Sequence, residues 1–125
     1  MITECRIDHE RRRVLVATDA RLELSDLRWL LDHKARLGVW SYDTVSDERA
    51  NRRAFSADEV RDIARLAATV SRRHGRGGRV AIVVTGEANY GMARMYSLLA
   101  EEHHLDCDVF RSVESAHAWL DAAPM

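Results

Sequence analysis

Hydrophobic and polar positions along the chain follow two periods, one typical of strands and one typical of helices. The segments with strand character are residues 3–7, 13–18, 39–44, 79–84 and 107–110. The first two are separated by a short polar turn, so they predict an antiparallel hairpin at the start of the chain. The segment RVAIVV at 79–84 is apolar on both alternating faces, which is typical of a central parallel strand covered on both sides.

The first helix is predicted between two residues that commonly mark helix ends. Ser25 is the expected N-cap and Gly38 the expected end of this helix. Leu24 and Trp29 have the spacing of a hydrophobic staple around its start. We therefore expect Trp29 to pack near the helix start or at the surface.

The second helix has the clearest signals in the sequence. Ser56 and Glu59 have the spacing of a capping box, and Phe55 and Val60 that of a second staple. The apolar positions recur at helical spacing: Val60, Ile63, Ala64, Ala67 and Val70. Three glycines within residues 75–78 then predict a tight return.

Two more helices are predicted, one after Gly86 and one after the N-cap Ser112, while residues 45–55 lack a period and predict a long loop. The order of elements is strand, strand, helix and then three strand–helix pairs. Right-handed crossovers make the later strands parallel. The sequence therefore predicts an α/β fold: one domain over residues 1–125, with one mostly parallel sheet, an N-terminal antiparallel hairpin and about four flanking helices.

Charge and composition argue against several classes of partner. The 19 Lys and Arg residues and 20 Asp and Glu residues give a net charge of -1, which disfavours a nucleic-acid or anionic-membrane binder. The longest apolar run is far shorter than the roughly twenty residues of a membrane span, so no transmembrane segment is expected. Cys5 and Cys107 form no CxxC pair and no signal-peptide pattern opens the chain, which favours a cytoplasmic location.

The candidate chemistry of metals and nucleophiles is sparse. The 6 histidines are scattered, and adjacent residues of EEHH at 101–104 diverge by about 100° on a helix, so no metal site is predicted. A chain of this length can bury a core without a cofactor, and none is predicted. Neither a GxSxG elbow nor a nucleotide-binding glycine motif is present, so no catalytic residue is assigned.

The segment GEANYGMARMYSLLA at 86–100 is the best candidate for a functional junction. On a helical wheel one side is predicted to be core: Ala88, Met92, Met95, Tyr96 and Leu99. The opposite side is predicted to be free: Tyr90, Arg94, Ser97 and Glu101. The alternative to a ligand site is a purely structural junction. In that case Gly86 only relieves a tight turn, Asn89 or nearby backbone caps the helix, and Gly91 lets the helix approach the sheet.

Ligands of open α/β sheets collect beyond the carboxyl ends of the strands. Residues 43–46, residues 86–90 and Arg111 are all expected at this edge. The candidate ligand-binding residues are Asp43, Thr44, Glu87, Asn89, Tyr90, Arg94 and Arg111. They would face one another across a shallow cleft.

Three motifs in the second half carry a family resemblance: RVAIVV at 79–84, YGMARMY at 90–96 and DVFRSVESAHAWL at 108–120. Their order and spacing resemble the C-terminal pattern of SpoIIAA-like proteins, also called STAS/SEC14 domain-containing proteins. The resemblance implies a STAS-like sheet with helices, in a family usually without an assigned activity. STAS relatives include anti-sigma-factor antagonists controlled by serine phosphorylation, and SEC14 relatives carry lipids. The Asp-Ser-Ser-Gly run of the antagonists is absent, and the nearest serines are Ser46 and Ser56. A SEC14-type lipid cavity is not expected, since a chain of this length has little volume to spare once its core is packed.

Three hypotheses for function follow. The first is a non-enzymatic STAS-like binding or regulatory module that acts through protein contacts, as a homodimer whose surface includes Trp29, Tyr90 and Trp119. The second is a carrier of a small molecule or lipid that uses the cleft at the carboxyl ends of the strands. The third, an enzyme at the same cleft, has the least support, because no catalytic motif accompanies it.

Overall fold

The computed structural model describes residues 1–122 and has the predicted order of elements. The strands are β1 (Ile2–Asp8), β2 (Arg13–Thr18), β3 (Asp43–Asp47), β4 (Val80–Val83) and β5 (Cys107–Phe110). The helices are α1 (Leu24–Arg36), α2 (Ala57–His74), α3 (Glu87–Glu102) and α4 (Val113–Asp121). The predicted α/β class, the hairpin and the four helices are thereby confirmed.

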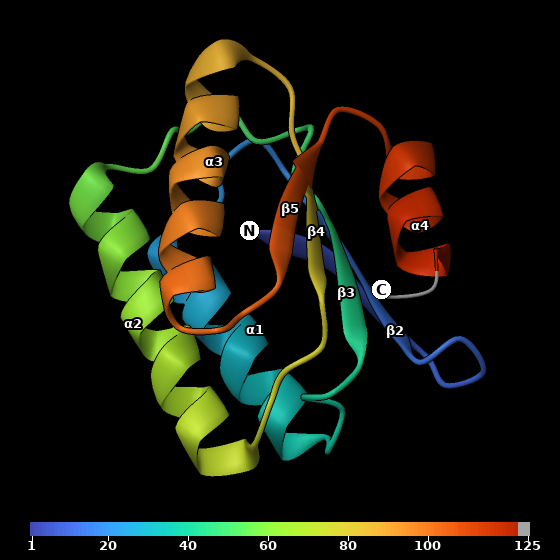
Figure 1. Cartoon of the computed structure of the whole chain (residues 1–125). Helices are drawn as coiled ribbons and strands as arrows, with labels where there is room; N and C mark the ends of the chain where they lie inside the picture. The colour runs from blue at the N-terminus through green and yellow to red at the C-terminus, as the bar shows by residue number, and fades with distance from the viewer. Residues whose placement is uncertain (123–125) are drawn as a thin grey trace.

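The five strands form one sheet in the order β1-β2-β3-β4-β5. β1 and β2 are antiparallel, and each later pair of neighbours is parallel. Each crossover from β2 onward leads to the next strand in the same direction, so right-handed connections place α1, α2 and α3 on one face (Figure 1). α4 follows the edge strand and packs on the opposite face against β3, β4 and β5.

The central strand β4 separates two apolar layers, as its two-sided hydrophobicity predicts. Ala81 and Val83 pack in the layer under α4, with Ala116 and Leu120 of that helix. Ile82 faces the other way and packs with residues of α3 and β5. Alternation along the strand therefore supplies both faces of the sheet, which is the pattern of a covered parallel strand.

The third strand lies later in the chain than predicted. The expected strand at 39–44 is wrong, because β3 covers Asp43–Asp47 and takes residues from the expected loop. Val39 and Trp40 are buried in a turn, where the Trp40 indole nitrogen donates to the Gly75 carbonyl at 3.0 Å. Pairing with β2 and β4 on both sides gives the polar segment 43–47 its extended conformation.

Two of the helix starts test the capping predictions. The capping box of Ser56 and Glu59 at α2 is confirmed, with both reciprocal hydrogen bonds present. The predicted N-cap Ser25 is wrong: the N-cap of α1 is Glu23, two residues earlier, and Glu23 and Asp26 form its capping box. Trp29 lies in the second turn of the helix and stacks on His33.

The predicted core face of α3 is corrected in part. Ala88 is exposed, whereas Ala93, Ser97 and Ala100 are buried. The Ser97 hydroxyl can be buried because it donates to the Arg94 carbonyl at 2.8 Å. This local hydrogen bond lets a polar side chain face the sheet, which hydrophobic spacing cannot indicate.

Candidate functional site

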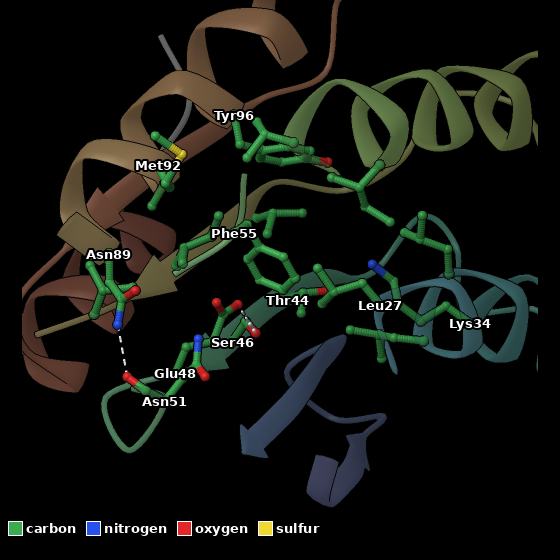
Figure 2. Close-up of a pocket in the computed structure, with 18 residues that line it drawn as sticks. Leu27, Lys34, Thr44, Ser46, Glu48, Asn51, Phe55, Asn89, Met92 and Tyr96 are labelled. Atoms are coloured by element: carbon green, nitrogen blue, oxygen red, sulfur yellow. Dashed lines mark hydrogen bonds between the residues drawn. The ribbon is translucent and has the colours of Figure 1, made fainter. Parts of the chain in front are cut away.

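A cavity of about 100 Å³ lies between the sheet and the layer of α1, α2 and α3 (Figure 2). Its walls are mostly apolar and include Leu30 of α1, Ile63 of α2, Ile82 of β4 and Met92 of α3. The loop before α2 adds the ring of Phe55. This volume is small, as expected of a short chain, but the cavity lies inside the fold and not in a surface cleft at the carboxyl ends of the strands.

The floor of the cavity is a row of polar side chains from the region of β3. Thr44, Ser46 and the following Glu48 line it, because alternate residues of an extended segment point to the same face. The Ser46 hydroxyl donates to Glu48 Oε2 at 2.8 Å. Burial raises the pKa of Glu48 to about 7, since a low-dielectric surrounding disfavours the charged carboxylate. At neutral pH this side chain is therefore poised between its two protonation states.

Lys34 lies at the end of the cavity near Thr44 (Figure 2). It is the only lysine in the sequence, and only 4% of its surface is exposed. Its ammonium group lies 5.0 Å from the centre of the Trp40 ring and has no hydrogen bond or ion pair within residues 1–122. Burial lowers the pKa of Lys34 to about 8, because the charged form loses its hydration.

Two hydroxyl groups at the cavity also lack protein partners. Thr44 is 1% exposed, and its Oγ1 makes no hydrogen bond to any described residue. The hydroxyl of Tyr96 likewise makes none in the part of the chain that the structure describes, and burial raises its pKa, so it keeps its proton. Lys34, Thr44 and Tyr96 thus present unpaired hydrogen-bond donors to one cavity.

The opposite end of the cavity is closed by asparagines. Asn89 Nδ2 donates to the Asn51 carbonyl at 2.7 Å, which ties α3 to the loop after β3. Asn51 Oδ1 in turn accepts from the backbone nitrogens of Leu22 and Arg53, at 3.0 and 3.1 Å. This network fixes the loop that carries Phe55 and so gives the cavity a defined wall.

The predicted ligand-binding residues separate into three places. Thr44 and Asn89 line the cavity. Asp43 lies at the other end of β3 from the expected edge and pairs with Arg79 at 3.0 Å. Its place follows from the shifted strand boundary, because residue 43 begins β3 instead of ending a strand.

The remaining predicted residues lie on the surface near the start of α3. Arg111 Nη2 lies 3.3 Å from Glu87 Oε1, and its guanidinium carbon lies 4.3 Å from the centre of the Tyr90 ring. Arg94 instead pairs with Asp108 at 3.4 Å. Glu87, Tyr90 and Arg111 are therefore brought together as predicted, but as a cluster whose charges satisfy one another.

The three aromatic residues predicted for a dimer surface lie on different parts of the molecule. Trp29 is 42% exposed on α1, and Tyr90 is on α3. Trp119 is on α4, where its ring centre lies 5.5 Å from that of Phe110. Because α1 and α4 cover opposite faces of the sheet, Trp29 and Trp119 do not share one surface (Figure 1).

Sequence reasoning missed Lys34, Ser46 and Glu48 as cavity residues. It assigned Tyr96 to the packed core, whereas Tyr96 lines the cavity. Two signals were available. Lys34 is the single lysine among many arginines, and it falls on the apolar side of a helix. Thr44, Ser46 and Glu48 alternate, which is the period of a strand with one polar face. Their burial could not be read from the sequence, because a polar strand face ordinarily meets solvent.

Comparison with known protein families, curated proteins and solved structures finds no match for this chain. No group of three or more potential metal ligands gathers within residues 1–122. Over the same residues, no helix combines the length and hydrophobicity needed to cross a membrane.

Proposed function

We propose that this protein is a small-molecule-binding module and that its ligand occupies the cavity between the sheet and the layer of α1, α2 and α3. The observation that carries this proposal is the set of unpaired donors at a mostly apolar cavity. Burying a polar group without a partner costs about 1–3 kcal/mol, so natural proteins rarely retain several of them together. A bound ligand would supply the missing partners.

The volume supports a small ligand. A dry cavity of roughly 150 Å³ binds benzene, so about 100 Å³ corresponds by simple scaling to roughly four heavy atoms. A longer molecule would have to extend past the walls, where Phe55 and Leu27 are only half-buried. The proposal thus keeps the carrier hypothesis but moves its site from a surface cleft to the interior.

Binding is favoured over catalysis by the surroundings of Glu48. Its raised pKa is what a general acid or base needs. However, the only side chain that hydrogen-bonds to it among residues 1–122 is Ser46, and no second acid–base group joins this pair. Membership of the SpoIIAA-like family and action through protein contacts stay predictions, which rest on the sequence motifs alone.

The test is to fill the cavity. Ala93 is buried and lines it, so Ala93→Leu should occupy the space without disturbing the surface. The matched control is Ala88→Leu, the same change at an exposed position of the same helix. Amide chemical shifts are followed by NMR while 1-propanol or sodium propionate is added.

We expect saturable shifts at residues around the cavity in the wild type and in Ala88→Leu, and none in Ala93→Leu. The proposal is wrong if neither probe gives saturable shifts in the wild type. It is also wrong if Ala93→Leu responds as the wild type does, since the probes would then bind elsewhere.

A further inference from the structure

The unpaired groups of the cavity share one chemical character. The Lys34 ammonium can only donate hydrogen bonds, and the hydroxyls of Thr44 and Tyr96 each carry a proton that they can donate. None of the three has a protein acceptor within the described residues. The missing partner is therefore an acceptor, and beside an ammonium group the most favourable acceptor is an anion.

The acidic side of the cavity lies away from these donors. Thr44 and Glu48 are four residues apart on an extended segment, which corresponds to about 13 Å along the strand. Ser46 lies between them and already donates to Glu48. In Figure 2, Glu48 accordingly lies toward Asn51, while Lys34 lies at the opposite end. An anion near Lys34 is thus separated from the one carboxyl group of the cavity.

We propose that the ligand is a small carboxylate, with its oxygens toward Lys34, Thr44 and Tyr96 and its hydrocarbon part against the apolar walls. This inference rests on the proposed function and adds the chemical class of the ligand. Two carboxylate oxygens offer about four acceptor positions, enough for all three donors. The apolar walls, among them Ile82 and Met92, suit a short alkyl chain and disfavour inorganic phosphate or sulfate.

The test compares three-carbon probes that differ mainly in the polar group: propionate, 1-propanol and propylamine. All are titrated at pH 6, where Glu48 is mostly protonated and Lys34 is charged. Because Lys34 is the only lysine, labelling with [¹³Cε]lysine gives one side-chain resonance that reports contact directly. We expect propionate to shift this resonance and to bind at least tenfold more tightly than 1-propanol, as a charge-assisted hydrogen bond allows.

Two variants test the assigned donors. Lys34→Met keeps the length of the side chain but removes the charge, so it should weaken propionate binding at least tenfold and leave 1-propanol binding within about threefold. Thr44→Val keeps the shape and removes one hydroxyl, so it should weaken propionate binding by about threefold or more. Arg28→Met is the matched control, because it removes an exposed cation from the same helix and should change neither affinity.

The outcomes separate this inference from the proposed function. If 1-propanol or propylamine binds as tightly as propionate, the carboxylate class is refuted while binding in the cavity stands. Unchanged propionate binding in both Lys34→Met and Thr44→Val would also refute it, and Thr44→Val alone decides if Lys34→Met does not fold. If none of the probes binds the wild type, the proposed function fails together with the inference.

Discussion

Replacing Lys34 with methionine should stabilise the empty protein at neutral pH. The ammonium group is buried at the cavity, it lies 5.0 Å from the centre of the Trp40 ring, and no hydrogen bond or ion pair to it is found among residues 1–122. Methionine has a similar length and can line the same apolar wall without a charge. The substitution therefore removes a desolvation cost and leaves most of the packing intact.

The size of the effect follows from the pKa of Lys34. Burial lowers this pKa from 10.5 to about 8, and each unit corresponds to about 1.4 kcal/mol, so charging the side chain in the folded protein costs on the order of 3 kcal/mol. The unfolded chain holds the proton more tightly, so wild-type stability rises as the pH increases from about 8 to 10.5. Lys34→Met lacks this dependence, and its advantage should be full below pH 8 and shrink above it.

The assay is urea unfolding of both proteins, followed by tryptophan fluorescence at several pH values from 7 to 10.5. In parallel, the [¹³Cε]lysine resonance gives the pKa of Lys34 directly. Cys5, Asp43 and Cys107 also act electrostatically on Lys34 and raise its pKa, an effect that the value of about 8 already includes. The reasoning is refuted if Lys34 titrates near 10.5, or if Lys34→Met is the less stable protein at pH 7.

The remaining predictions concern a carboxyl group, a helix cap and two glycines. Glu48→Gln should be more stable than the wild type at pH 8 but not at pH 4: the folded carboxyl has a pKa of about 7 against 4.5, so wild-type stability falls as the pH rises through this range. A stability difference that does not change with pH would contradict this. Ser56→Ala should lose about 1 kcal/mol of unfolding free energy in urea, whereas Ser25→Ala, which removes no cap, should stay within about 0.5 kcal/mol. Gly78→Ala should destabilise by about 1–3 kcal/mol, because its Cβ would clash with a backbone carbonyl, while Gly91→Ala should stabilise by about 0.5–1 kcal/mol in an open part of α3. Equal thermal stability of the two glycine variants would be evidence against this packing.

Local sequence patterns are sufficient to predict a structural feature when that feature depends on one short segment. The capping box of Ser56 and Glu59 involves four consecutive residues, and the two-sided hydrophobicity of RVAIVV is a property of six. Both predictions are confirmed. The N-cap of α1 was misplaced because Ser25 is a better capping residue in isolation, whereas Glu23 and Asp26 satisfy each other in the folded chain.

The candidate site was predicted only in part, for a physical reason. Asn89 was identified from its place in the first turn of the helix after β4, near the carboxyl end of that strand. Thr44 was identified for a wrong reason, because it lies near the start of β3 and not at the carboxyl end of a strand. The burial of Lys34 and Glu48 depends on three helices that cover a polar strand face from one side. In the sequence, such residues look the same as solvated ones, since charge alone does not indicate exposure.

The sequence by itself determined the order of the elements, the class of the fold and the two-sided central strand, because hydrophobic period and turn residues act over short distances. Tertiary structure alone decided that β3 begins at Asp43 and that its polar residues face inward. It also decided that a cavity remains between these polar residues and the layer of α1, α2 and α3. Cavities are small differences in packing between distant segments, so no local pattern encodes them.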